Sequence, residues 1–460
     1  MLKPRLILCL LSVVLAALFM PAAPVLDEES YLDIARQMPW LRPYDWYRAW
    51  QPWGAEVPQD SFLFAHPPLH LYWIKLTGGL RAAGLLWAGL LGLAAGDICE
   101  RGRDPWGSAA VWMSSPIVAL SLVMTLGIDL PVVALSTAGV ALYLRDRRVL
   151  AGVVLGMAVG WKYPAVLLLP VLLWHGRRRS WPVLAGAVAV VASVELFLWV
   201  QYGRPHVLEV LVTAGDIGRG PVLERAIGVL ARLGTTVAGA SPFALLGVGP
   251  ALLVDHDHGL AGTALMAALS GCGLALLIRA GRVRGLFGMW ALVVVAGVVF
   301  AHNYADGRYL LPAVLPLAMV CGGLPRLQLR IAAGLQALLA AGLVHGELRY
   351  AEGAASVALD AERYTGEWSF ASGMQDRGSR FWSTDEVLPA GTLVAVPLHA
   401  SPGPIPPSWE EVARTPSEGG AGLRLVDLEH GVGWHADTLG PLPFWYGEGP
   451  YETVVLRRVP

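Results

Sequence analysis

The sequence predicts a polytopic α-helical membrane protein, with about 11 to 13 spans and a small α/β domain at its C-terminal end. Three observations support this fold class. Hydrophobic residues make up 55% of the 460 residues and charged residues only 15%, where a soluble protein usually carries about a quarter. The apolar residues form long runs that basic clusters separate, which is typical of membrane spans and cytoplasmic loops. After residue 345 the chain becomes polar and rich in Pro and Gly.

This composition also excludes several classes of protein. So little charge would leave too much apolar surface in water for a disordered chain, a coiled coil or most cytosolic enzymes. The net charge is -1 and no basic face accompanies a soluble fold, so we expect no nucleic-acid partner. The four cysteines are far apart in or beside apolar runs, without a CxxC motif, and we expect them to be buried rather than paired or zinc-bound.

The first predicted span runs from Leu6 to Met20, directly after Lys3 and Arg5. A cleaved signal peptide is the alternative, but Pro24 disfavours cleavage. Because positive residues stay on the cytoplasmic side, we expect a cytoplasmic N-terminus and an outer face at Asp27. The protein is thus expected to be a multi-pass protein of the inner (plasma) membrane.

The remaining predicted spans follow the alternation of apolar runs and arginines. They lie at about 69–95, 106–126, 130–144, 181–200, 309–323 and 331–344, while the order of spans within 237–301 stays open. We assign 1–345 to a transmembrane domain, with an aromatic first outer loop at 25–68, and 346–460 to an extracytoplasmic domain. Short β-like runs at 392–397, 423–427 and 451–459 support the latter.

Arginine clusters flank the apolar segment 149–174 at both ends. If both clusters are cytoplasmic, the segment must cross outward and return. Lys162-Tyr163-Pro164 is the expected break, because proline cannot continue a helix. Broken helices at membrane depth are tolerated where they are buried in protein or line a watery cavity.

Acidic residues follow the first span, at Asp27 and Glu28, with Tyr31 one helical turn further on. A carboxylate at the membrane surface could accept a proton from an attacking hydroxyl or amine. The alternative is structural, because Asp27 is a good N-cap and Glu28 suits the positive end of a helix dipole.

His66, Asp129, Lys162 and Arg308 are the other charged or titratable candidates near the outer membrane boundary. His66 precedes two prolines and could hold a phosphate, although a solvated histidine at a helix start explains it equally. Charges within spans are costly and usually face a bundle interior or a cavity. Snorkelling of the two cations, and helix capping by Asp129, are the alternatives.

The run from Asp255 to His258 has metal-ligand chemistry, but consecutive side chains diverge and cannot all bind one ion. We therefore interpret it as a solvated turn and expect no metal and no cofactor.

Five motifs occur in one order along the chain: the acidic pair after the first span, His66-Pro67-Pro68-Leu69, Gly160-Trp161-Lys162-Tyr163-Pro164, Arg308-Tyr309-Leu310-Leu311-Pro312 with Pro316, and Gly366-Glu367-Trp368-Ser369-Phe370. Together they resemble the C-type superfamily of membrane glycosyltransferases. The resemblance is nearest to glycosyltransferase family 39, the protein O-mannosyltransferases and lipid A aminoarabinose transferases.

The resemblance implies an inverting glycosyltransferase. Its donor would be a sugar linked to polyprenyl phosphate, a membrane lipid. Asp27 or Glu28 would then act as the base or orient the acceptor. His66, Lys162 and Arg308 are the candidates for binding the donor phosphate. The expected cavity-lining residues are Tyr31, Asp129, Tyr163 and Tyr309. The sugar and the acceptor, whether protein, lipid or glycan, stay open.

Two other functions remain open at this level. A transporter or flippase of a lipid-linked intermediate would also use broken helices and intramembrane charge, but it predicts two related halves, and the sequence has no such repeat. An inactive scaffold whose outer domain binds a partner predicts that Asp27 and Glu28 can be replaced without loss of function.

Overall fold

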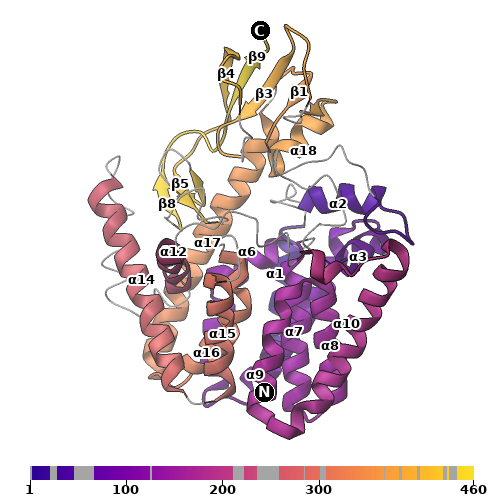
Figure 1. The fold of residues 1–460 in the computed structure, drawn as a ribbon. Helices are drawn as coiled ribbons and strands as arrows, with labels where there is room; N and C mark the ends of the chain where they lie inside the picture. The colour runs from indigo at the N-terminus through magenta and orange to yellow at the C-terminus, as the bar shows by residue number, and fades with distance from the viewer. Residues whose placement is uncertain are drawn as a thin grey trace.

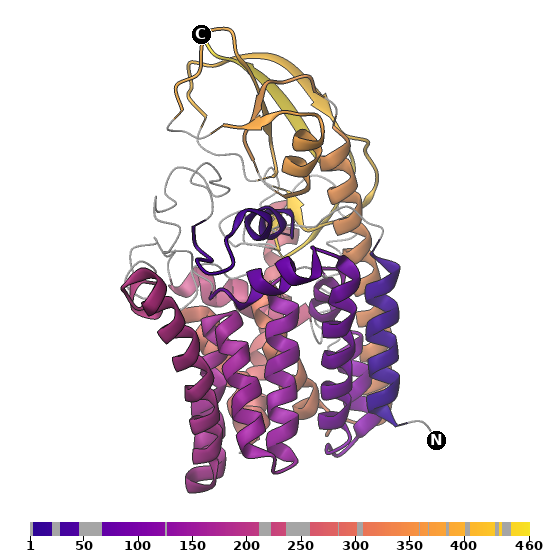
Figure 2. The same ribbon diagram turned by 90° about the vertical axis from the view of Figure 1, so that its right-hand side faces the viewer.

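The computed structural model describes residues 3–20, 28–45, 67–124, 127–210, 222–235, 258–283, 285–300, 307–357, 359–366, 368–382, 386–400, 405–427, 432–434 and 443–460. They form a bundle of helices with a smaller β-sheet domain at one end (Figures 1 and 2). The N-terminal helix starts at the end of the bundle that lies away from this outer domain (Figure 2).

The N-terminal half of the bundle is a row of packed helices. Its members are α1 (Pro4–Leu18), α4 (Gly84–Cys99), α7 (Asp129–Leu144), α8 (Arg148–Trp161) and α10 (Trp181–Tyr202), each packed on the next. Glycines bring their backbones close together. A Cβ at Gly92 would lie 2.4 Å from the Leu8 carbonyl oxygen, and one at Gly152 would lie 2.1 Å from the Val183 carbonyl oxygen. Small residues at such contacts are typical of helix packing in membranes.

Shorter elements connect and cover this row. They are α2 (Glu28–Gln37), α3 (Leu69–Thr77), η2 (Arg81–Ala83), α5 (Pro105–Met113), α6 (Pro116–Val123), η3 (Tyr163–Leu167), α9 (Leu168–Gly176) and η4 (Arg177–Ser180). Helix α2 lies across the end of the bundle, below the outer domain (Figure 2).

Two predicted spans differ from the observed helices. The stretch 69–95 is not continuous, because α3 ends at Gly78 and Gly79, whose φ angles of 62° and 71° favour glycine. A Cβ at Gly79 would also lie 2.1 Å from a Leu32 side-chain carbon of α2, so the turn allows the two helices to approach. The stretch 106–126 is bent by 57° between α5 and α6, where Pro116 interrupts the helix.

The C-terminal half of the bundle contains α12 (Val222–Thr235), α14 (His258–Arg282), α15 (Leu286–Phe300), η6 (Gly307–Leu310), α16 (Leu311–Cys321) and α17 (Arg326–Ser356). Helix α17 continues through the predicted domain boundary at 345/346 and carries the chain into the outer domain (Figure 1). The predicted segment 237–254 lies outside the described residues.

Several helices are long and apolar enough to cross a membrane. They are Arg81–Cys99, Tyr163–Tyr202, Ala264–Arg282 and Arg326–Ser356, with the bent pair α5–α6 as a fifth if it forms one span. Shorter apolar helices are Pro4–Leu18, Asp129–Leu144, Arg148–Trp161, Leu286–Phe300 and Arg308–Cys321. The predicted class, a helical bundle with several apolar spans and a small sheet domain, is confirmed. The predicted number of spans stays a prediction.

Charged residues gather at the end of the bundle that lies away from the outer domain. Asp97 at the end of α4 accepts a hydrogen bond from the Arg145 Nε at 3.0 Å and pairs with Arg101 at 3.6 Å. The hydrogen bonds and charge of Asp97 raise the pKa of Arg145. The Arg5 backbone N–H donates to Glu100 at the same end (3.3 Å). We call this the basic end.

The predicted return of segment 149–174 is confirmed. Helix α8 ends at Trp161, Lys162 is extended (φ -157°, ψ 121°), and η3 and α9 lead back. The Arg148 guanidinium at the start of α8 donates to the Arg179 carbonyl after α9 at 2.8 Å. Both arginine clusters therefore lie at the basic end, and Lys162 lies at the opposite end of α8.

The outer domain holds a five-stranded sheet of order β2-β1-β3-β9-β4 and two hairpins, β5–β8 and β6–β7. The strands are β1 (Arg363–Tyr364), β2 (Arg380–Phe381), β3 (Leu393–Pro397), β4 (Glu410–Pro416), β5 (Gly422–Arg424), β6 (Val426–Asp427), β7 (Val432–Gly433), β8 (Trp445–Gly447) and β9 (Thr453–Arg458). Pairing is parallel at β1 and antiparallel around β9. The three predicted β runs are confirmed, because β3, β5 with β6, and β9 occupy them.

Helix α17 joins the two parts. Gly346 lies so close to the hairpin strand β5 that a Cβ there would lie 1.9 Å from the Leu423 carbonyl oxygen. Helix α18 (Trp368–Asp376) packs on both α17 and α2. The outer domain is therefore packed on the bundle next to the first outer loop.

Candidate active site

The break after α8 and the start of α7 lie at the end of the bundle that faces the outer domain. Helix α7 begins at Asp129 and ends next to Arg145, at the basic end. Lys162 ends α8 because Pro164, which lacks an N–H, follows two residues later. Arg308 belongs to η6, which leads into α16 and its Pro312. Three segments far apart in sequence thus present charged side chains at one level.

These side chains form one cluster. The Lys162 Nζ donates to an Asp129 carboxylate oxygen at 2.7 Å, and the Arg308 Nε lies 3.7 Å from the other oxygen. The Tyr309 ring faces both cations, with its centroid 4.4 Å from the Lys162 Nζ and 5.3 Å from the Arg308 guanidinium carbon. The Lys162 side chain is only 7% exposed, so it does not snorkel to solvent.

The cluster combines charges of both signs. Lys162 and Arg308 contribute two positive charges, against one on Asp129 among the members of the cluster. Unit charges about 4 Å apart attract by roughly 4 kcal/mol at the effective dielectric of a protein, so Asp129 holds both cations in place. Lys162 and Arg308, brought together in this way, are charged donors of the kind that bind a phosphate.

A second group lies on the other side of the break. The Tyr163 hydroxyl donates to Glu195 of α10 at 2.8 Å and also contacts the His206 Nδ1. The second Glu195 carboxylate oxygen accepts from the Val207 backbone N–H at 3.2 Å. Tyr44 of the first outer loop stacks on His206 (centroids 4.6 Å apart). This network ties the break and the first outer loop to the end of α10.

A third group links α2 to the same break. The Trp161 Nε1 donates to the His70 Nδ1 at 3.2 Å, which leaves the His70 proton on Nε2 if the ring is neutral. Tyr31 of α2 meets the His70 ring edge-on at 4.9 Å. Tyr31 and His70 are both buried. Since α2 begins at Glu28, three residues before Tyr31, the first turn of α2 lies near the residue that precedes Lys162.

The structure therefore brings together part of the predicted site. Asp129, Lys162, Arg308 and Tyr309 converge, while Tyr163 points to Glu195 and Tyr31 to His70. Asp27 and His66 lie outside the described residues, as does the side chain of Glu28. Their predicted roles remain predictions.

Three residues of these networks were missed by the sequence analysis: His70, Glu195 and His206. His70 lies four residues after His66, so it belongs to a short histidine-containing motif, whereas the other two have no such local signal. Glu195 is a lone carboxylate in the middle of an apolar helix, which by itself marks a functional candidate. His206 follows Pro205 in a polar stretch with no pattern around it.

No metal cluster is present in the described part of the chain, where no three His, Cys, Asp or Glu side chains are grouped to hold an ion. The run from Asp255 to Asp257 lies outside that part.

Part of the chain matches a known protein family. Residues 74–178 match the N-terminal domain of the alpha-(1->6)-mannopyranosyltransferases of the MptA_B family. This segment runs from α3 to η4 and includes Asp129 and Lys162, but neither Arg308 nor the first outer loop. The match supports the resemblance to membrane glycosyltransferases that the motifs predicted.

Two solved structures of one protein match this chain over most of its length. ArnT from Cupriavidus metallidurans bound to undecaprenyl phosphate is 15% identical, with a TM-score of 0.47, and the match covers 77% of this chain and 66% of that one. The apo state of the same protein is 16% identical, with a TM-score of 0.38, over 85% of this chain and 92% of that one. The search of curated proteins found no match.

Proposed function

We propose that this protein is an inverting membrane glycosyltransferase that moves a sugar from a polyprenyl-phosphate donor to an extracytoplasmic acceptor. The observation that carries the proposal is the cluster of Asp129, Lys162 and Arg308, in which a buried lysine and a half-buried arginine meet one carboxylate at a helix break. The family match over residues 74–178 supports the same reaction class.

The donor phosphate would bind at Lys162 and Arg308. A polyprenyl donor lies in the bilayer, so its phosphate reaches the protein at the membrane surface, where the break lies. As the bond between the anomeric carbon and the phosphate oxygen breaks, its electron pair moves to the phosphate. Fixed cations stabilise this developing charge and need no proton transfer to the leaving group. The two side chains would thus stabilise the departing phosphate, and no metal is required.

The acceptor would attack from the opposite face of the sugar. Its hydroxyl or amine forms the new bond to the anomeric carbon and gives up its proton to a carboxylate. Asp27 and Glu28 are the proposed bases, because the first turn of α2 lies near Trp161 through Tyr31 and His70. The configuration at the anomeric carbon inverts because attack and departure occur on opposite faces.

The test is transfer by the purified protein in detergent, with polyprenyl-phosphate mannose as the first donor and a crude acceptor extract. Asp27→Asn or Glu28→Gln should lower turnover at least 100-fold while the elution profile and thermal midpoint stay unchanged. Glu29→Gln, a matched change at the neighbouring position, serves as the control. Normal turnover in both single variants and in the double variant would rule out the assigned base.

We further propose that the basic end faces the cytoplasm, because arginine-rich loops are retained there. The N-terminus is then cytoplasmic, and the outer domain is extracytoplasmic. Single cysteines can test this, at Arg147 on the basic end and at Glu410 on the outer domain. An impermeant thiol reagent applied to intact spheroplasts should label Glu410→Cys and not Arg147→Cys. The reverse pattern would overturn the orientation.

A further inference from the structure

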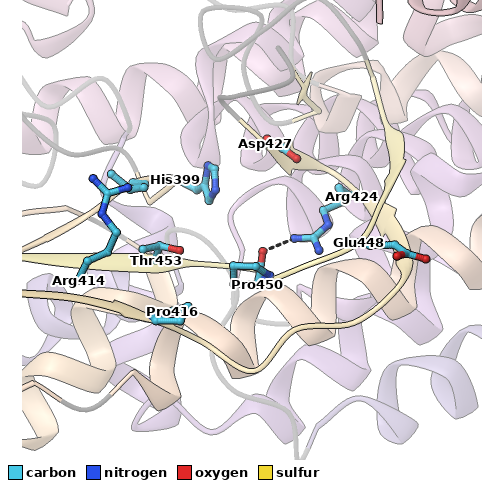
Figure 3. Close-up of a pocket in the computed structure, with 9 residues that line it drawn as sticks. His399, Arg414, Pro416, Arg424, Asp427, Glu448, Pro450 and Thr453 are labelled. Carbon is cyan, nitrogen blue, oxygen red and sulfur yellow. Dashed lines mark hydrogen bonds between the residues drawn. The ribbon is translucent and has the colours of Figure 1, made fainter. Parts of the chain in front are cut away.

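A cavity lies in the outer domain between the five-stranded sheet and the two hairpins, away from the proposed transfer site. Its volume is about 310 Å³, which falls at the lower end of small-molecule sites. Polar lining residues come from several strands and loops: His399, Arg414, Arg424, Asp427, Glu448 and Thr453. Figure 3 shows Arg414 and His399 on one side, Arg424 and Glu448 on the other, and Thr453 and Pro450 between them.

Arg424 is a rigid part of this wall. Its guanidinium donates to the carbonyl oxygens of Pro450 (2.6 Å), Gly449 (2.7 Å) and Gly420 (3.2 Å). The Tyr451 ring lies beneath it, 4.3 Å from the guanidinium carbon. Burial lowers the pKa of Arg424, and the nearby charge of Asp427 raises it. Three of the five N–H groups of arginine are thus used and the Nε–H is buried, which leaves one Nη1 N–H for a ligand.

The opposite wall is held by a buried carboxylate. Glu452 accepts hydrogen bonds from the backbone N–H groups of Leu398 (2.9 Å), His399 (3.0 Å) and Ala400 (2.9 Å). Tyr350 of α17 donates to the same carboxylate at 3.3 Å. Burial raises the pKa of Glu452, against the lowering effect of His399 and the backbone donors. Leu398 and His399 therefore have fixed positions before any ligand binds, which is what an effective binding site needs.

The charges of the cavity determine which ligand it suits. Arg414 is paired with Glu411 of the same strand at 3.2 Å, and Arg424 lies near Asp427, while Glu448 also lines the cavity. The lining therefore offers both cationic donors and carboxylate acceptors. Carboxylates only accept hydrogen bonds and guanidinium groups only donate them, whereas a sugar hydroxyl does both. A free phosphate would use the arginines but would be repelled by the two carboxylates. Leu398, Pro416 and Pro450 add apolar surface for the C–H groups of a sugar ring.

We propose that this cavity is a subsite for an uncharged saccharide, the sugar part of the acceptor. The inference rests on the proposed function for its biological role, but saccharide binding itself requires no transfer. The acceptor would be anchored in the outer domain while its reacting group reaches the bundle.

The experiment measures binding of α-1,6-mannobiose to the full-length protein in detergent without donor, by saturation-transfer NMR and calorimetry. We expect weak saturable binding that Glu448→Gln and Arg414→Gln each weaken about tenfold, the effect of about one lost hydrogen bond of 1.4 kcal/mol. Both residues are exposed, so the variants should fold. Glu410→Gln, on β4 outside the cavity lining, is the matched control and should bind normally.

Two outcomes would overturn the subsite. One is mannobiose binding that neither variant changes. The other is inorganic phosphate that binds more tightly than mannobiose and loses affinity in Arg414→Gln alone, which would assign the cavity to an anion. Binding that follows the prediction in a protein without transfer activity would refute the proposed function and leave the subsite intact. Sugar transfer that proceeds with no saccharide bound at the cavity would refute the subsite and leave the proposed function intact.

Discussion

The bundle and the outer domain both bury charge, but they neutralise it differently. In the bundle, Lys162 and Arg308 are held by the side chains of Asp129 and Tyr309. In the outer domain, Glu452 is held mainly by backbone N–H groups and Arg424 by backbone carbonyls.

This difference has a consequence for ligand binding. Backbone groups are fixed by the sheet and its loops, so the charges that they neutralise are permanent parts of the fold. Side-chain partners can rotate, so a cation in the bundle can exchange Asp129 for an incoming phosphate. We therefore expect the bundle charges to control catalysis and the outer-domain charges to control stability and the shape of the cavity.

The largest expected effect is that of Lys162→Met. Loss of a preorganised cation at the leaving group should lower kcat by about 100- to 1,000-fold. The measurement is sugar transfer under saturating donor, with Arg147→Met at the basic end as a matched exposed control. If Lys162→Met retained full turnover, the bundle cluster would have a structural role only. The expected difference between the bundle charges and the outer-domain charges would then not exist.

The outer domain should respond in stability instead. Glu452→Gln places an amide N–H₂ where the carboxylate accepts hydrogen bonds, which should cost about 2–3 kcal/mol and lower the unfolding midpoint by roughly 10 °C. Tryptophan fluorescence during heating can follow this, because Trp434 and Trp445 are buried there. Glu411→Gln on the exposed face of β4 should shift the midpoint by no more than about 2 °C. Equal shifts in both variants would contradict the structural role of Glu452.

Asp129→Asn tests whether the donor phosphate replaces Asp129 as the partner of Lys162 and Arg308. Without the carboxylate, Lys162 and Arg308 are no longer neutralised by it, so donor phosphate binding should tighten, with about a tenfold lower donor KM. Thermal stability should fall because the buried Lys162 and the half-buried Arg308 then repel each other. A raised donor KM together with lost stability would indicate that Asp129 only maintains the fold.

The smallest expected effect is that of Tyr163→Phe. It removes the hydroxyl that joins Glu195 and His206, which should cost about 1 kcal/mol of stability and a few-fold in activity. Tyr202→Phe, which loses the hydrogen bond from the Tyr44 backbone N–H, is a comparable control in the same network. A loss in Tyr163→Phe as large as in Lys162→Met would move the reactive centre to the other side of the break.

Much of this organisation could be predicted from local sequence. The break at Lys162-Tyr163-Pro164 follows from proline chemistry, and the start of α7 follows from Asp129, the charged residue that separates two apolar runs. The outer strands follow from short runs of β-branched residues. The turn at Gly78 and Gly79 was missed because hydrophobicity does not reveal that α2 must pack against Gly79.

The pairing of site residues could be predicted only in part. Charge within apolar segments indicated Asp129, Lys162 and Arg308 separately. Their common contact depends on the packing of α7, α8 and η6, which no local pattern encodes. His70, Glu195 and His206 were missed for the same reason, since each acquires its partner from another helix.

The length of the continuous helix α17 determines how far the outer domain extends from the bundle. Its 31 residues correspond to about 46 Å at 1.5 Å per residue, whereas the hydrocarbon layer is about 30 Å thick. A rod of this length that starts at one lipid surface would extend roughly 16 Å beyond the other, and would so set the height of the proposed saccharide subsite. A molecule that occupies the cavity and reaches the bundle must bridge that height, so chain length would become a criterion for acceptor selection.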